Sequence, residues 1–298
     1  MHTKKRNDKS KKIIFICVAV ILLTIGVVAN IWASLNYLTV NHFTYVSDKL
    51  SSDQGIRVVV LADLHDHGIG TDNQKLVEKV RAQEPELILM IGDFVNDTSE
   101  DSFVVCELIE EIKDIAPVYF ALGNHELGYM KQHPELVAEL EAAGAEVLDK
   151  EYVDIEINGT KSRLGGMYDY AFGLNGKDEA AAAPEDVKRF LEEYQDTDRL
   201  KLMMTHLPDS FIFGDAASYW DVDFVLSGHL HGGQVVVPFF GGLYGGDQGW
   251  FPEYVHGMYE KENIQLFVTS GLGSNWKALP RFNNLPEIAV VEIQGAKD

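Results

Sequence analysis

Short aliphatic runs alternate with amphipathic stretches along most of this chain, and this alternation limits what it can fold into. Runs of about four to eight β-branched or aliphatic residues are typical of buried strands, and apolar residues that recur with helical spacing are typical of helices packed on a sheet. We expect strands at residues 57–62, 87–91, 118–122, 153–157, 163–167, 200–205, 223–226, 234–237, 257–259, 264–269 and 288–293. We expect helices at residues 73–83, 99–114, 134–143 and 184–195. This order predicts a layered α/β fold.

The amino terminus has a different character. Residues 13–35 contain no charged side chain, and 23 helical residues are enough to cross the hydrocarbon core of a bilayer. A cleaved signal peptide is the alternative, because Val27, Val28 and Ala29 are small residues of the kind found at cleavage sites. The length of the run and the presence of Trp32 favour a retained transmembrane anchor.

The charge on either side of the anchor predicts its orientation. Six basic residues precede residue 13, so residues 1–12 are expected to form a cytoplasmic tail. Residues 36–55 are then expected to be a linker, and residues 56–298 one domain on the outer side of the membrane. We expect a single domain because the polar motifs extend from residue 63 to residue 231. The predicted location is the cell membrane, with one span and an extracytoplasmic body.

The part of the chain beyond residue 12 is strongly acidic. The whole sequence has 25 basic and 46 acidic residues, a net charge of −21. Without residues 1–12, which hold six basic residues and Asp8, the net charge is −26. Such a surface is not expected to bind nucleic acid by counterion release. The two cysteines, Cys17 and Cys106, indicate neither a disulfide framework nor a cysteine zinc site.

Polar side chains follow five of the expected strands, at the point where each strand ends. In chain order they are Asp63 and His65, Asp93, the run Asn124, His125 and Glu126, then His206, and last His229 and His231. In open α/β sheets, ligand sites gather at the carboxyl ends of strands. Asp, His and Asn side chains together suit divalent cations such as Mn, Fe, Zn or Mg. The sequence therefore predicts a metal site.

Taken alone, each of these residues would have an ordinary structural role. A single His206 after a strand would be a hydrogen-bonded strand-end histidine. Asp63 or Asp93 would cap a helix or form a turn, and Asn124 would adopt a left-handed turn conformation. The ordered set of five blocks favours metal ligation for all of them.

The order and spacing of the blocks resemble the calcineurin-like metallophosphoesterases. That family has the pattern D-x-H, G-D, G-N-H-D/E, a lone His and G-H-x-H, and all five blocks occur here in that order. The resemblance covers roughly residues 56–295. It is greatest to the bacterial membrane-anchored branch, given the apolar segment, the GHLHGGQ run at residues 228–234 and the SGLGSNW run at residues 270–276. It implies a layered α-β-β-α sandwich of two mostly mixed sheets.

The resemblance also implies a centre of two divalent metal ions, with Mn, Zn, Fe, Co or Mg as the possible metals. The implied ligands are Asp63, His65 and His231 for one ion, Asn124, His206 and His229 for the other, and Asp93 between them. A hydroxide shared by the ions would attack a phosphate mono- or diester, with a lipid-linked or envelope substrate among the options. His125 would steady the phosphoryl oxygens or protonate the leaving group.

Several neighbouring residues keep more than one interpretation. Glu126 could orient a histidine or be an acid at the start of a helix. A solvated loop is favoured for His67, while Lys277 and Arg281 could contact an anion or lie in solvent. The phosphoprotein phosphatases follow their G-D with V-D-R-G, but residues 94–97 here contain no arginine, so that phosphate clamp is missing.

Two segments and one alternative function remain open. Residues 173–183 are rich in Gly and Ala and are expected to form a surface loop. Residues 237–259 place aromatic side chains on a Gly-rich segment that could form core strands, an apolar wall or a contact with a bilayer. The alternative function is a membrane-anchored metal-binding module with degenerate catalysis. Another two-metal hydrolase is less favoured, and the sequence contains no His-Glu-x-x-His motif of a zincin.

Overall fold

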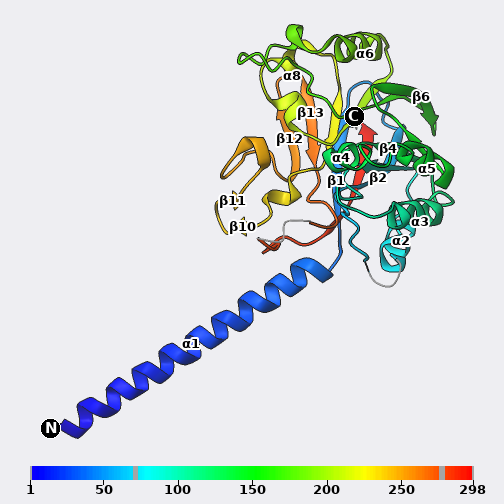
Figure 1. Cartoon of the computed structure of the whole chain (residues 1–298). Coiled ribbons are helices and arrows are strands. Elements are labelled where there is room, and N and C mark those ends of the chain that lie inside the picture. Colours follow the sequence, from blue (N-terminus) through cyan, green and yellow to red (C-terminus); the bar gives the residue numbers. More distant parts are fainter. Residues whose placement is uncertain (1, 70–72, 275–278, 297–298) are drawn as a thin grey trace.

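Two six-stranded sheets lie face to face in the body of the molecule (Figure 1). The computed structural model describes residues 2–69, 73–274 and 279–296. The first sheet has the order β1-β14-β2-β3-β4-β5. Its strands are β1 (Thr39–Ser47), β2 (Gly55–Leu61), β3 (Leu87–Ile91), β4 (Val118–Ala121), β5 (Ala145–Val147) and β14 (Glu287–Gly295). Only β14 and β2 pair antiparallel, so β2, β3 and β4 end at the same edge.

The second sheet has the order β12-β13-β9-β8-β7-β6. Its strands are β6 (Glu151–Ile157), β7 (Thr160–Met167), β8 (Leu200–Thr205), β9 (Phe224–Ser227), β12 (Gly257–Lys261) and β13 (Ile264–Val268). The four central strands, β7, β8, β9 and β13, are parallel. The two edge strands, β6 and β12, pair antiparallel with β7 and β13. Both sheets are therefore mixed, which confirms the predicted fold class.

Alternation along the strands produces the layers. Val58 and Val60 of β2 pack between the two sheets with Leu202 and Phe224, whereas Val59 faces the helices on the outer side. The helices on that side are α2 (Gln74–Arg81), α3 (Phe103–Ile112) and α5 (Leu136–Ala143). The second sheet is covered by α6 (Glu185–Gln195), α7 (Asp209–Ile212) and α8 (Ala216–Tyr219). The result is an α-β-β-α sandwich with three apolar layers.

The linker predicted over residues 36–55 is wrong, because the nine residues of β1 lie within it. β1 pairs parallel with β14, and the Tyr45 ring stacks on Phe224 with centroids 4.4 Å apart. Polar residues such as Asn41 and His42 conceal this strand in the sequence, and its partner lies near the other end of the chain. The folded body therefore begins at Thr39 and not at residue 56.

Most other predicted elements are confirmed, with bounds that differ by a few residues. The strands predicted at 87–91 and 200–205 match β3 and β8. The helix predicted at 99–114 begins only at Phe103, because the Ser99 hydroxyl donates to Asp66 in the loop after β2 and Ser99 thereby belongs to the loop before α3. The strand predicted at 234–237 shortens to β10 (Val236–Val237), which pairs with β11 (Gly241–Gly242).

Short elements were missed because they are too short to show a period. These are α4 (Asn124–Tyr129), β5, α7, α8, β11 and the 3₁₀ turns η1 (Ala180–Ala182), η2 (His231–Gly233) and η3 (Gly246–Gln248). The surface loop predicted at 173–183 is wrong in part. Ala180 and Ala183 are buried in the layer beneath α6, because their small side chains fit against Phe190 and its neighbours.

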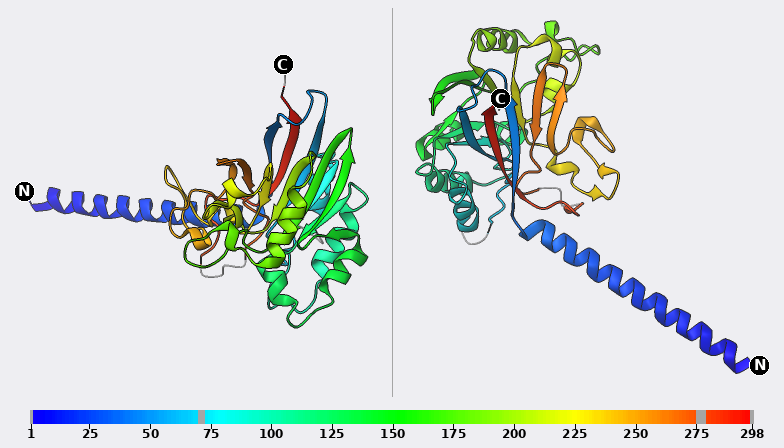
Figure 2. Two further views of the ribbon diagram at one scale, coloured as in Figure 1. Left: turned by 90° about the horizontal axis from the view of Figure 1, so that it is seen from above. Right: turned by 180° about the vertical axis from the view of Figure 1, so that it is seen from behind.

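A single long helix, α1 (His2–Asn36), projects from the body (Figure 1). Its stretch from Lys11 to Asn36 is long and apolar enough to cross a membrane, and its apolar side chains are exposed rather than packed on the body. Figure 2 shows α1 extending away from the body in both further views. This supports the predicted membrane-spanning segment by length and composition.

Candidate metal centre

The polar residues predicted as ligands gather where five strands end. Asp63 and His65 follow β2, Asp93 follows β3, Asn124 begins α4 after β4, His206 follows β8, and His229 and His231 follow β9. Three groups have ligand atoms that all lie within 4.8 Å of one another. The groups are Asp63, His65 and His231; His65, Asp93 and His125; and Asp93, His206 and His229. The parallel strands of both sheets thus deliver their ends to one place.

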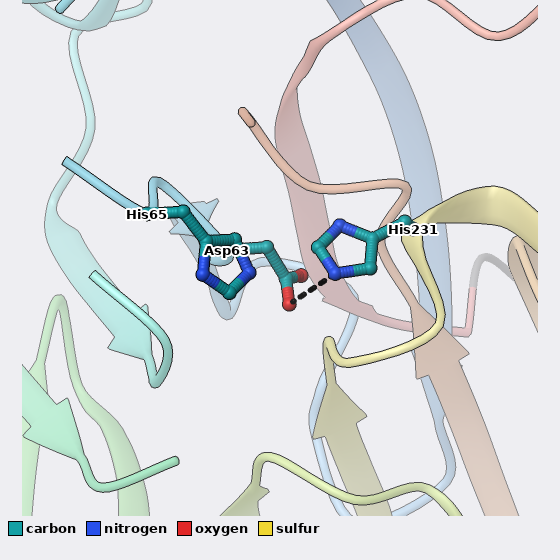
Figure 3. Close-up of side chains that lie close together, drawn as sticks. All are labelled: Asp63, His65 and His231. Carbon is teal, nitrogen blue, oxygen red and sulfur yellow. Dashed lines mark ion pairs between the residues drawn. The ribbon is translucent and has the colours of Figure 1, made fainter. Parts of the chain in front are cut away.

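The first group joins the two sheets. His231 Nε2 lies 3.8 Å from Asp63 Oδ1, and the rings of His65 and His231 have centroids 5.1 Å apart. Figure 3 shows the Asp63 carboxylate pointing toward the His231 ring, with His65 on its other side. These three side chains converge from loops of both sheets, as a shared cation would require.

Asp93 lies between the other residues of the centre. Its Oδ2 is 3.1 Å from His206 Nε2, 3.9 Å from His65 Nε2 and 4.0 Å from His125 Nε2. The side chain is only 2% exposed. One oxygen of Asp93 is therefore within about 4 Å of the Nε2 atoms of three histidines.

Three of the histidines are oriented by a hydrogen bond at Nδ1. His206 Nδ1 lies 2.9 Å from the Ile91 carbonyl, His231 Nδ1 lies 3.1 Å from the Gly273 carbonyl, and His65 Nδ1 lies 3.1 Å from Asn96 Oδ1. A neutral imidazole that donates from Nδ1 presents its lone pair at Nε2. In each case Nε2 faces a carboxylate of the centre.

Nine buried side-chain polar atoms of the described residues lack a hydrogen bond, and two of them belong to predicted ligands. Among the described residues, no partner reaches His65 Nε2 or Asn124 Oδ1. A buried acceptor that is left unpaired costs about 1 to 3 kcal/mol, so such groups normally have a reason. Both atoms are lone-pair donors of the kind that bind divalent cations. The donor set of the centre therefore fits metal ions.

The backbone of the centre is strained. Positive φ angles occur at five predicted ligands, namely Asp63 (57°), His65 (52°), Asp93 (58°), His229 (71°) and His231 (46°). Residues other than glycine rarely adopt this conformation, which costs on the order of 1 to 3 kcal/mol each and concentrates at functional sites. The turns direct the side chains inward at the expense of stability.

Glycines allow the close packing around the carboxylates. A Cβ added at Gly123 would lie 2.3 Å from Asp93 Oδ1, and one at Gly271 would lie 2.6 Å from Asp63 Oδ2. Gly271 also has a φ of 71°, which suits glycine. Larger residues at these positions would displace the carboxylates.

Burial and the neighbouring charges set the protonation of these groups. Burial raises the pKa of Asp63 to about 7 and lowers the pKa values of His65 to about 4 and of His229 to about 3. Burial alone would lower the pKa of His206, but the Asp93 carboxylate raises it to about 10. His65 and His229 are thus neutral near pH 7; His65 Nε2 has no hydrogen bond, whereas His229 Nδ1 lies 3.2 Å from His206 Nε2. His206 must release a proton before it can bind a cation.

Glu126 is an acid in the first turn of α4, which is one of the two roles considered from the sequence. It is 1% exposed, and its carboxylate accepts hydrogen bonds from the backbone N–H groups of Gly123 at 2.8 Å, Asp93 at 2.7 Å and Phe94 at 2.7 Å. Glu126 thereby fastens the loop after β3 to the start of α4. It positions Asp93 through the backbone rather than through a histidine.

Arg281 is neither an anion contact nor a solvated residue. It is fully buried, and its guanidinium donates to the carbonyls of Gly271 at 3.1 Å and Gly273 at 3.0 Å, and to the carbonyl of Ser270. His67 is exposed, with Nε2 3.3 Å from the Leu35 carbonyl at the end of α1. Lys277 lies outside the described residues.

Sequence reasoning missed the supports of the ligands. Asn96 and the carbonyls of Ile91 and Gly273 orient three histidines, but backbone acceptors carry no sequence signal. The proximity of Asn96 to Asp93 in the chain was the one available hint. His125, predicted as catalytic, is brought to the centre with its side chain 18% exposed.

The family model and the curated relatives indicate one family. A family model described as calcineurin-like phosphoesterase matches residues 56–233. A metallophosphoesterase of Campylobacter jejuni is 27% identical over 305 aligned positions, which cover 98% of this chain and 74% of that protein. The phosphodiesterase YaeI of Escherichia coli is 29% identical over 216 positions, which cover 71% of each. Phosphopantetheinyl hydrolase of Mycobacterium tuberculosis aligns with a TM-score of 0.46 at 13% identity, over 75% of this chain and 91% of that one.

Proposed function

The chain belongs to the calcineurin-like phosphoesterase family, whose model matches more than half of its length, and from that premise we propose that it hydrolyses a phosphate mono- or diester with two divalent metal ions. Membership makes the protein a phosphoric ester hydrolase with a metal site. The number of ions, their ligands and the class of ester are the content of the proposal.

The proposed ligands are the members of the first and third groups of the centre together with Asn124. One ion would be held by Asp63, His65 and His231 and the other by Asn124, His206 and His229, with Asp93 as a ligand available to both. The position of Asp93 carries this assignment. It shares one group with His65 and another with His206 and His229, and its Oδ2 lies 3.9 Å and 3.1 Å from Nε2 of His65 and His206.

Two ions at this centre supply, when bound, an activated water as nucleophile and neutralise charge on the phosphoryl oxygens. His125 is assigned to the leaving group. Only the imidazolium form of His125 can act as the acid, and the Asp97 carboxylate, 3.4 Å from Nδ1, would accept the Nδ1 proton of that form and leave the second proton on Nε2. Nε2 faces the centre, 4.0 Å from Asp93 Oδ2, and the side chain remains accessible to a substrate. The leaving oxygen takes the proton from this nitrogen.

The proposed location is the outer side of the cell membrane. The six basic residues before residue 13 favour a cytoplasmic amino terminus, and α1 then carries the body across. An envelope or lipid-linked phosphoester is the substrate class that suits this location. Mn, Zn, Fe, Co and Mg all suit the donor set, so the identity of the metal depends on supply as well as on the ligands.

The test uses the full-length protein in detergent with p-nitrophenyl phosphate and its bis ester. Each ester is assayed with Mn, Zn, Fe, Co or Mg after the protein has been stripped with a chelator. We expect hydrolysis that disappears on chelation and returns with at least one metal. Turnover that persists after complete removal of metal would refute the proposal. Tight metal binding without turnover of either ester would instead support the metal-binding module.

A further inference from the structure

Four exposed aromatic side chains lie within the segment of residues 236–251. Phe239, Phe240, Trp250 and Phe251 are 105%, 73%, 67% and 54% exposed, and we call them the aromatic surface. Phe239 and Phe240 lie at the turn of the β10–β11 hairpin. The rings of Phe240 and Phe251 have centroids 6.3 Å apart. Exposed large apolar groups gathered in this way mark a site of interaction with a protein or a membrane.

Hydrogen bonds connect this hairpin to α1. Asn30 Nδ2 donates to Asn283 Oδ1 at 2.6 Å, and the Asn283 N–H donates back to Asn30 Oδ1 at 2.8 Å. Asn283 Nδ2 donates in turn to the carbonyl of Val236, the first residue of β10, at 3.2 Å. The side chains of Asn30 and Asn283 therefore link α1 to the base of the hairpin.

The position of Asn30 sets the depth of the hairpin relative to a bilayer. Asn30 lies inside the apolar stretch from Lys11 to Asn36, about 9 Å from its end at the helical rise of about 1.5 Å per residue. Trp32 and Tyr37, near the same end, are 65% and 63% exposed. Aromatic side chains with a polar edge favour the membrane interface. The hairpin therefore lies level with the interfacial end of α1.

The views agree with this placement. In Figure 1 the lobe of β10 and β11 lies on the side of the body from which α1 leaves. The same yellow and orange lobe faces along the helix in both views of Figure 2. A bilayer crossed by α1 would thus meet the aromatic surface rather than the helices α2, α3 and α6.

We propose that the aromatic surface inserts into the interface of the same bilayer that α1 crosses. The bilayer is chosen over a second copy or another protein because the hairpin is tied to the span itself. The chain has no Lys or Arg between Lys201 and Lys261, whereas Asp247 and Glu253 lie near the aromatic side chains in sequence. Insertion is therefore apolar and does not depend on anionic lipid or on low salt.

Insertion fixes the orientation of the metal centre relative to the membrane. His231 begins the turn η2, which leads directly into β10. The Leu243 N–H donates to the Gly233 carbonyl at 3.1 Å, and a Cβ added at Gly233 would lie 2.4 Å from Gly242 Cα. The hairpin is thus packed on the segment that carries two proposed ligands. Two attachments, α1 and the aromatic surface, restrict rotation of the body relative to the membrane more than α1 alone would.

The experiment measures tryptophan fluorescence of the full-length protein in phosphatidylcholine nanodiscs, with and without bromine on the acyl chains. The difference between wild type and Trp250→Phe gives the contribution of Trp250. The same subtraction with Trp32→Phe gives a tryptophan of the span, and with Trp220→Phe a tryptophan that is 2% exposed within the body. Brominated lipid should quench Trp250 and Trp32 and leave Trp220 unchanged, at low and at high salt.

A double substitution tests the surface itself. The double variant Phe239→Ser with Phe240→Ser should lose most of the quenching of Trp250. Each ring that no longer enters the apolar phase should weaken insertion by more than about tenfold. Phe103→Ser is the matched control. Phe103 is 63% exposed and begins α3, on the side of the body away from β10 and β11 (Figure 1). It should leave the quenching of Trp250 unchanged.

Two outcomes would overturn the proposal. One is that Trp250 remains unquenched in discs where Trp32 is quenched. The other is that the emission of Trp250 shifts to the blue without quenching, which would indicate that a protein partner or a second copy covers the surface. Hydrolysis of p-nitrophenyl phosphate by the same discs reports separately on the proposed function. Quenching of Trp250 without any hydrolysis would count against the hydrolase and not against insertion.

Discussion

Asp93 and His125 lie side by side in the metal centre, but their surroundings differ. Asp93 is 2% exposed and its Oδ2 faces His206 and His65, while the His125 side chain is 18% exposed. Asp93→Asn removes a negative charge from between two proposed cations. It should lower both the number of ions bound per chain and the rate of hydrolysis. Elemental analysis of the purified variant, alongside its kcat, measures both effects.

His125→Ala should keep both ions and lose turnover. General acid catalysis is worth roughly 100-fold to 10,000-fold, and the loss should appear mostly in kcat. The loss should be smaller with a p-nitrophenyl ester, whose leaving group needs no proton, than with an alkyl ester. Loss of metal from His125→Ala would make His125 a ligand. An equal loss with both esters would mean that it holds the phosphate and does not donate a proton.

Arg281 supports the centre through backbone carbonyls. The Gly273 carbonyl accepts from Arg281 Nη1 at 3.0 Å and lies 3.1 Å from His231 Nδ1, so the arginine holds the acceptor that orients a proposed ligand. Arg281→Lys keeps the charge but loses the fork of donors. We expect metal binding to weaken by roughly 10-fold to 100-fold, as for other groups that orient ligands. Calorimetric titration of the stripped protein with metal measures this.

Arg163→Lys provides the matched control for that prediction. Arg163 lies on β7, is 9% exposed, and bonds Asp154 and the carbonyl of Glu193 at the end of α6, away from the centre. Its substitution should lower the thermal midpoint and leave the affinity for metal unchanged. Equal effects of the two substitutions on metal affinity would refute a specific role for Arg281.

Sequence reasoning succeeded for residues that act through their own side chains. Asp63, His65 and Asp93 stand directly after aliphatic runs, and parallel pairing of β2 and β3 brings them together. Arg281 was misjudged because its partners are backbone groups of loops whose course no local pattern reveals. The hydrogen bonds that Glu126 accepts from the loop after β3 were missed for the same reason. A buried arginine and an exposed one look alike in a sequence.

The elements differ in how visible they are in the sequence. α6 was predicted because Val187, Phe190, Leu191 and Tyr194 repeat with the period of one buried helical face. β3 was predicted because all five of its residues are aliphatic or Met, and the structure buries all five. β1 was missed because polar residues interrupt it and its only neighbour in the sheet, β14, lies near the other end of the chain. Pairing between distant segments decides such strands.

Tyr45 shows that β1 belongs to the folded body. The residue is 7% exposed and stacks on Phe224 of the opposite sheet. Tyr45→Ala should destabilise the body by about 3 kcal/mol, near the low end for loss of a large buried aromatic side chain. Thermal unfolding of the full chain in detergent should show a midpoint lowered by several degrees. Tyr37→Ala, at a residue that is 63% exposed, should leave the midpoint unchanged. Equal midpoints for both variants would mean that β1 does not belong to the folded body.

At the scale of the whole molecule, the proposal places the body outside the cytoplasm. The basic residues before α1 carry this expectation. Protease added to intact cells or protoplasts should digest the body or release it from the membrane. Protection that ends only on lysis, when the same protease then cleaves the body, would reverse the orientation.

Two ions at one centre are proposed to perform the hydrolysis. The direct measurement adds metal stepwise to the stripped full-length protein and records, at each step, the ions bound per chain and the rate on a p-nitrophenyl ester. Because Asp93 is shared by two of the ligand groups, we expect two ions per chain at saturation and a rate that rises chiefly as the second ion binds. Full activity with a single bound ion, or two bound ions without turnover of any ester, would contradict the account.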